Sequence, residues 1–416
     1  MIQEKSRFNQ IVGICLYLYA AFVFMFNADS SKNTLIYLVY AALVGLLGLT
    51  ALKKGVLNIC GELVLLVGYL AFGFFSIIWA VNTDAAVTAT RTLLILIVAV
   101  LLIYDWLTQT KRTDILLRAI IFAGLCESVY FLLTYGVQEV IDAINDGLRI
   151  GFLLDNENAI GKNMAISLAA LFGYALCFRK YKHLLLAIPM LVVLIATGSR
   201  TSLISLLFGV AVVTCVLLSR LQNKKLSRRL PTVILVVVGI VVAWNAMKTM
   251  PFLQGIVQRF EGLENTITGE TGGDGSSATR LDYVRLGLQQ FLDTPLFGNG
   301  LGCAGQILKE KYGYVTYLHN NFAEILASGG LVGFLLYYGM YAVTLFKHIK
   351  LLKTKNPVVT ASLGILCCEL VSHIGSVNYY SKIAYLLFAL WVSVGNGHFQ
   401  DFEGELSGEK GLAGSE

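Results

Sequence analysis

Long apolar segments recur along this chain, and they constrain its fold more than any other feature. Each covers roughly 15 to 25 residues, enough for an α-helix to cross about 30 Å of hydrocarbon. Because backbone polar groups in lipid need partners within the protein, the pattern predicts an all-α, polytopic integral membrane protein with about twelve transmembrane helices. The segments begin near Phe8, Thr34, Leu57, Thr92, Ile115, Ala159, Leu184, Ser202, Pro231, Asn320, Pro357 and Ile383.

The composition is that of a membrane protein. Hydrophobic residues make up 56% of the 416 residues and charged residues 14%, too few to coat a soluble globule of this size. The formal net charge is +6, but the basic residues fall in short clusters between apolar segments, which argues against a nucleic-acid partner. The eight cysteines lack the spacing of metal ligands, and we interpret them as small apolar core residues.

Lysine and arginine are concentrated in alternate connections between the apolar segments. The other connections carry mainly single basic residues such as Lys32, Arg91 and Lys382. The positive-inside rule therefore predicts that both termini lie in the cytoplasm. No small-residue cleavage site follows the first segment, which we expect to remain as an anchor. The basic clusters are Lys5 and Arg7; Lys53 and Lys54; Lys111 and Arg112; Arg179, Lys180 and Lys182; Arg220, Lys224, Lys225, Arg228 and Arg229; and Lys347, Lys350, Lys353 and Lys355.

Two connections on the predicted outer side are long, and long loops often carry function. They run from Gly136 to Glu157 and from Lys248 to Leu318. In the second, a glycine-rich tract at 269–277 precedes a helix-like segment at 279–292, an arrangement that suits either a lid or a plain linker. We divide the chain into transmembrane helices 1–9 at 1–247, a large extracytoplasmic loop with an amphipathic helix at 248–318, transmembrane helices 10–12 at 319–395 and a disordered cytoplasmic tail at 396–416.

Several arginines occupy positions where a cation is costly or isolated. Arg200 lies between two apolar segments at their predicted outer boundary, where it is either an interface anchor or an anion site. Arg280 and Arg285 open the helix-like segment and point to different faces at about 100° per residue, so each is either a surface charge or part of a site. Arg149 and Asn158 bracket the smaller outer loop.

His319 begins the tenth apolar segment, followed by Asn320 and Glu324. A histidine at an outer membrane surface can take a proton from a hydroxyl, and a histidine at a helix start can equally be a cap or interface residue. Asn320 and Glu324 share one helix face, whereas Glu324 lies roughly 140° from His319. Glu324 could therefore orient the histidine only if His319 belongs to the loop.

Motifs for several other chemistries do not occur. We find no phosphate-binding loop ending in Gly-Lys-Ser/Thr, no HExxH zinc motif and no DxD pair in the outer loops. The glycine-rich residues 298–302 follow no strand and open no βαβ unit. We therefore expect no nucleotide cofactor and no metal.

An ordered set of short motifs resembles the bacterial O-antigen ligase and polysaccharide polymerase superfamily. Its members are membrane glycosyltransferases that act on undecaprenyl-diphosphate-linked glycans. The motifs are TGSRT at 197–201, TRLDY at 279–283, DTPLFGNGLG at 293–302, LHNNFAE at 318–324 and GGLVG at 329–333. Each motif is weak by itself, and the order of the set gives it specificity.

The resemblance implies roles for individual residues. Arg200 and Arg280 would grip the diphosphate of the lipid-linked donor, and His319 would act on the acceptor hydroxyl. Arg149 and Asn158 match a less regular pattern as accessory residues. Further candidates for substrate binding are Asn320, Glu324 and Arg285. The resemblance also implies a multi-pass protein of the bacterial cytoplasmic (inner) membrane, with a glycan or lipid acceptor, membrane lipid and other polysaccharide assembly proteins as partners.

The chemistry of the residues is compatible with such an enzyme. Nucleotide sugars are not supplied outside the cytoplasm, so an activated sugar there must be carried on a membrane lipid. Two arginines can stabilise the negative charge of a diphosphate leaving group without a metal. A neutral histidine on the opposite face would give inversion at the anomeric carbon. A flippase or exporter of the same lipid-linked glycans is the alternative from a different class. Ligase, polymerase and protein glycosyltransferase all remain open within the superfamily.

Overall fold

The computed structural model of the chain describes residues 2–27, 30–151, 153–221, 248, 254–268 and 275–400. Over this part of the chain the secondary structure consists of α-helices and short 3-10 helices, with one isolated β-bridge between Arg112 and Phe399. The predicted all-α fold class is therefore confirmed.

Seven described helices are long and apolar enough to cross a membrane. They are α1 (Ile2–Phe26), α2 (Asn33–Lys54), α4 (Thr83–Thr110), α5 (Asp114–Tyr135), α7 (Glu157–Cys177), α9 (Arg200–Leu221) and α14 (Asn321–Leu351). Shorter apolar helices are α3 (Gly61–Ser76), α8 (Ala187–Thr197) with the 3-10 turn before it, α15 (Pro357–Ser372) and α16 (Lys382–Gly395). The predicted segment near Pro231 lies outside the described residues, and the count of about twelve spans stays a prediction.

The outer surface of the helix bundle is apolar in many places. Leu38 and Leu52 on α2, Phe75 on α3 and Ile78 just after it are each more than 60% exposed. Such a surface would drive aggregation in water, whereas lipid covers it without cost. Together with the seven long apolar helices, these side chains identify a polytopic membrane protein.

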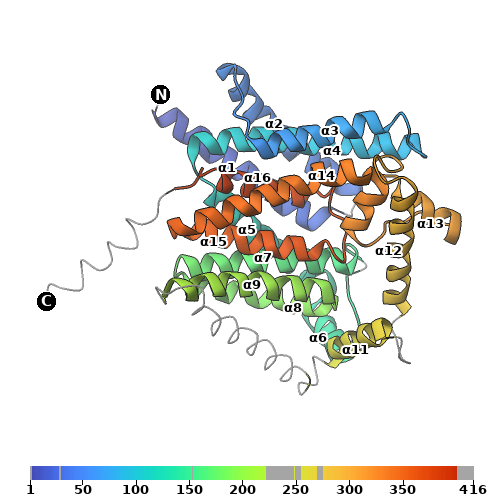
Figure 1. Cartoon of the computed structure of the whole chain (residues 1–416). Coiled ribbons are helices and arrows are strands. Elements are labelled where there is room, and N and C mark those ends of the chain that lie inside the picture. Colours follow the sequence, from blue (N-terminus) through green and yellow to red (C-terminus); the bar gives the residue numbers. More distant parts are fainter. Residues whose placement is uncertain are drawn as a thin grey trace.

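The long helices run roughly side by side, and α7 lies between α15 and the pair α8 and α9 (Figure 1). It packs against α5, α8, α9 and α15. Gly161 on α7 permits a close approach to the turn between α8 and α9. A Cβ built there would meet the Ser199 Cβ and the Thr197 Oγ1, each at 2.8 Å. The turn between α8 and α9 is thereby held against α7.

One end of the bundle carries the helices of the long connections: α6 (Val137–Asn145), α11 (Gln254–Thr268), α12 (Gly275–Asp293) and α13 (Ala304–Tyr312). Figure 1 shows α12 standing across the ends of the long helices, with the start of α1 at the opposite end. The helix predicted at 279–292 is confirmed as part of α12. Residues 269–274 of the glycine-rich tract lie outside the described residues.

The residues after α12 are pinned to the bundle. The Asn299 N–H donates to the carbonyl of Ala327, and the Leu301 N–H donates to the Ser76 hydroxyl. Gly330 has a φ of +58° and interrupts the helical geometry of α14 where this segment docks. A Cβ at Gly330 would come within 2.5 Å of the Leu296 carbonyl carbon, so only glycine fits there.

The first residues after α16 lie at the other end of the bundle. His398 packs edge-on against Tyr104, and the Gln400 carbonyl accepts a hydrogen bond from the Asn356 side chain. Of the predicted tail at 396–416, residues 396–400 are thus held in contacts with α4 and the α14–α15 connection, and residues 401–416 lie outside the described residues.

Candidate active site

Four of the residues singled out from the sequence gather in one small cavity. Arg149, Asn158, Arg200 and Arg280 line a space of about 70 Å³ at the end of the bundle that carries α12. They come from the loop before α7, the first turn of α7, the start of α9 and α12, respectively. Three guanidinium groups from separate segments therefore face a single space.

Arg200 is positioned by the turn between α8 and α9. Gly198 ends α8 in the left-handed conformation, with φ +57°, and Arg200 is the first residue of α9. Its Nη2 donates to the Ser277 hydroxyl on α12 at 2.8 Å. The positive end of the α9 helix dipole adds positive potential near the same space. The site thus joins the bundle to α12 through Arg200.

Arg149 ties the loop before α7 to the end of α8. Its Nε donates to the Thr197 carbonyl at 2.8 Å, and its Nη2 donates to the Asn158 Oδ1 at 2.9 Å. A carboxylate oxygen of Glu157 lies 3.7 Å from the same Nη2. Arg149 is therefore held on three sides and serves to shape the small cavity.

His319 lies in the loop immediately before α14, as its proposed orientation by Glu324 would require. Its φ of +54° is in the left-handed region, which is uncommon for a residue with a side chain and recurs at functional sites. The imidazole lies between two aromatic rings: the centroid of Tyr317 is 4.2 Å away, and Tyr283 is stacked at 6.2 Å. The ring is thus fixed in orientation.

The charge state of His319 follows from this environment. Burial, together with the positive charge of Arg280, lowers the pKa of His319 to about 4. The imidazole is consequently neutral at physiological pH, and one ring nitrogen is available to accept a hydrogen bond. Arg280 therefore connects the small cavity electrostatically to the histidine.

Glu324 and Asn320 hold the loop rather than the imidazole. The Glu324 Oε2 accepts the N–H of Leu318 at 2.8 Å. The Asn320 side chain accepts the Ala323 N–H at 3.0 Å as the cap of α14 and donates to the Ile374 carbonyl at 3.1 Å. Both residues fix the backbone on either side of His319.

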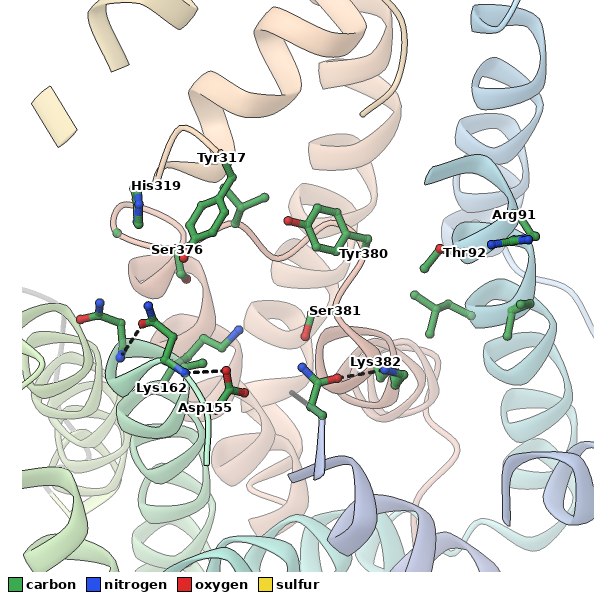
Figure 2. A pocket seen from close by; sticks show the side chains of 18 of the residues that line it. Arg91, Thr92, Asp155, Lys162, Tyr317, His319, Ser376, Tyr380, Ser381 and Lys382 are labelled. Atoms are coloured by element: carbon green, nitrogen blue, oxygen red, sulfur yellow. Dashed lines mark hydrogen bonds between the residues drawn. The ribbon is translucent and has the colours of Figure 1, made fainter. Parts of the chain in front are cut away.

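A larger cavity of about 860 Å³ opens on the His319 side of the site. Asn158 lines both cavities, so the two spaces adjoin. Figure 2 shows Tyr317 and His319 on one wall and Arg91 and Thr92 of α4 on the other. The site therefore has a small cationic compartment beside a roomy one, with the histidine at the roomy side.

The sequence did not single out every residue of this site. Asp155 lines the large cavity, and burial raises the pKa of its carboxyl above its usual value. Lys162 on α7 also lines this cavity. In contrast, Arg285 is exposed on α12 and lines neither of the two cavities. The predicted divergence of Arg280 and Arg285 accounts for that difference.

These features define a polytopic α-helical membrane protein with a cationic pocket at one end of the bundle. Residues 185–338 match the family model described as O-antigen ligase, which confirms the resemblance to the O-antigen ligase and polysaccharide polymerase superfamily. The matched region includes Arg200, Arg280 and His319, whereas Arg149 and Asn158 precede it. The matched part of the chain is accordingly similar to the O-antigen ligase family. No curated protein matches the chain.

Proposed function

We propose that this protein is an inverting, metal-independent glycosyltransferase. It transfers or polymerises a lipid-diphosphate-linked oligosaccharide on the outer face of the bacterial cytoplasmic membrane. The observation that carries the proposal is the convergence of Arg200 and Arg280 on one small cavity that adjoins the cavity of His319. An anion site beside a neutral base is the arrangement that displacement of a diphosphate leaving group needs.

In this proposal the donor diphosphate occupies the small cavity. A guanidinium group can hold two phosphate oxygens at once, and Arg200 and Arg280 present two such groups from different elements. As the bond from the sugar C1 to the diphosphate oxygen breaks, negative charge collects on that oxygen. Fixed cations in a water-poor pocket stabilise this charge with little reorganisation. Arg149 and Asn158 support the pocket through their mutual hydrogen bond.

The acceptor hydroxyl would approach from the large cavity. Its oxygen forms the new bond to C1 on the face opposite the leaving diphosphate, and its proton passes to a ring nitrogen of His319. Inversion at C1 follows from attack on that opposite face. Asp155, which lines the same cavity, is a second group able to accept the proton, directly or from the histidine through water.

The same proposal fixes the topology. The site and the helices of the long connections would face outward, and the basic connections, with both termini, would face the cytoplasm. The division at residues 1–247, 248–318, 319–395 and 396–416 is part of this proposal. A lipid-linked glycan is then the donor, and a second glycan, a lipid or a protein is the acceptor. Other polysaccharide assembly proteins are further partners in this proposal.

The test is turnover by the purified protein in lipid nanodiscs, with an undecaprenyl-diphosphate oligosaccharide as donor. We expect release of undecaprenyl diphosphate together with a lengthened or transferred glycan. Arg280→Gln should lower turnover about 100-fold, as loss of a group that stabilises developing charge does. Arg285→Gln removes the same charge from the exposed side of the same helix, and its turnover should stay near that of the wild type.

Two results would contradict the proposal. One is glycan movement across the bilayer without release of the lipid diphosphate, which would identify a flippase or exporter. The other is equal turnover of the Arg280→Gln and Arg285→Gln proteins, because the cavity would then have no part in the reaction.

A further inference from the structure

The large cavity is lined by more positive than negative charge. Arg91 on α4, Lys162 on α7 and Lys382 at the start of α16 line it. Asp155 is the one carboxylate among the described residues of its lining. Three separate helices supply the three cations, so tertiary packing brings them together. Like charges around one space repel, and an arrangement of this kind needs an anion to balance it.

The two lysines each donate a hydrogen bond to a neutral side chain. The Lys162 Nζ donates to the Asn378 Oδ1 at 2.6 Å, and the Lys382 Nζ donates to the Asn27 Oδ1 at 2.9 Å. An amide oxygen satisfies a hydrogen bond but does not cancel a charge.

The side chain of Arg91 has no hydrogen bond or ion pair with any residue that the structure describes. Figure 2 shows it on the wall of the cavity across from Tyr317 and His319. It is exposed, so a bound group can reach its guanidinium without moving the fold.

The surrounding carboxylates compensate the three cations unequally. Lys162 is coupled electrostatically to Glu369, Asp155 and Glu127, two of which lie behind the cavity wall. Asp155 also acts on Lys382. Carboxylates of the protein therefore compensate the charge of Lys162. The uncompensated positive charge of the cavity lies mainly on Arg91 and, in part, on Lys382.

We propose that the large cavity binds an acceptor carrying an anionic substituent, a carboxylate or a phosphate, which is held by Arg91 and Lys382. This inference rests on the proposed function, in which the acceptor approaches from this cavity. With its hydroxyl at His319 and its anion at the opposite wall, the acceptor is held in one orientation. A volume of about 860 Å³ lies within the range of ligand pockets, about 300 to 1,000 Å³, and accommodates a short oligosaccharide.

The test measures binding without donor, so that it does not depend on turnover. The purified full chain in phosphatidylcholine nanodiscs is titrated with α-1,4-trigalacturonate and with α-1,4-galactotriose, which differ only in their carboxylates. A galactotriose monophosphate serves as a third probe, and the tighter of the two anionic probes tells carboxylate from phosphate. At low salt we expect the better anionic probe to bind about tenfold tighter than galactotriose, a difference of about 1.4 kcal/mol. The preference should shrink as salt rises.

Variants test whether Arg91 and Lys382 cause the preference for the anionic probes. Arg91→Gln and Lys382→Gln should each reduce the preference severalfold and leave the affinity for galactotriose unchanged, which also shows that they fold. Lys309→Gln removes a charge from the exposed surface of α13, outside the large cavity, and should keep the full preference.

Three outcomes overturn the inference. They are equal affinity of the wild type for all probes, an unchanged preference in both cavity variants, and loss of the preference when phosphatidylglycerol replaces part of the phosphatidylcholine. The last outcome would assign the two cations to lipid headgroups. Failure of glycosyl transfer would show in the turnover assay instead, so the two proposals fail separately.

Discussion

Replacing Glu324 tests whether the loop before α14 positions His319 for its proposed role. Glu324 is 3% exposed, and its Oε2 accepts the N–H of Leu318, a fully buried residue immediately before the histidine. In Glu324→Ala this N–H loses its partner without gaining water, at a cost of about 1–3 kcal/mol. Because His319 has a left-handed φ, the released loop should relax to other backbone conformations.

The expected effect is on turnover. A displacement of about 1 Å in a catalytic group costs about 100-fold, so kcat of Glu324→Ala should fall about 10- to 100-fold. The KM for the donor should change little, since Arg200 and Arg280 belong to other elements. Steady-state kinetics in nanodiscs with the lipid-diphosphate donor measures both constants.

Matched variants separate positioning from charge. Glu324→Gln keeps an oxygen able to accept the Leu318 N–H and should restore most of the lost kcat. Glu310→Ala, on the exposed face of α13, should behave as the wild type. The reasoning would be refuted by wild-type kcat in Glu324→Ala, or by a Gln variant as slow as the Ala variant, which would indicate that the negative charge itself is required.

Two further predictions concern the charge of the histidine and the packing of the α8–α9 turn. The pKa of His319, about 4, lies below the value of about 6.5 expected for the unfolded chain, so the unfolded state binds the extra proton first as pH falls. The free energy of unfolding should therefore fall by up to about 3 kcal/mol between pH 7 and pH 4. Thermal unfolding at each pH measures this fall, which should be smaller in His319→Gln. An equal dependence of stability on pH in both proteins would contradict the lowered pKa of His319. At Gly161, an added methyl would meet the Ser199 Cβ and Thr197 Oγ1 at 2.8 Å, so Gly161→Ala should cost about 1–3 kcal/mol and raise the KM for the donor. The control is Gly48→Ala on α2, where no atom lies within 4 Å of the added Cβ. Equal thermal stability of the two variants would show that the α8–α9 turn moves away from the added methyl at no cost.

The sequence by itself determined the class of fold. Apolar segments long enough to span hydrocarbon must form helices in lipid, and their predicted starts at Thr34, Pro357 and Ile383 lie within one residue of the starts of α2, α15 and α16. The start predicted at Leu57 was less accurate, because α3 begins at Gly61 after an extended stretch. Apolarity alone does not mark where a connection ends.

The sequence also supplied the residues of the small cavity. Arginines at membrane boundaries are costly enough to stand out, and Arg200 and Arg280 fall within motifs of the superfamily. The resemblance selected Arg280, but helical geometry by itself could not, because it says that Arg280 and Arg285 diverge but not which of them faces the bundle. The packing of α12 across the helix ends decides that.

Only the tertiary structure decided what surrounds the histidine and what lines the large cavity. Glu324 contacts the N–H of Leu318 instead of the imidazole, and His319 adopts a left-handed conformation in the loop before α14. Arg91 and Lys382 looked like isolated charges in separate connections, and they line the same cavity because α4 packs against α16. Hydropathy is a property of each segment, whereas a cavity is made where segments distant in the chain meet, and no local pattern encodes that meeting.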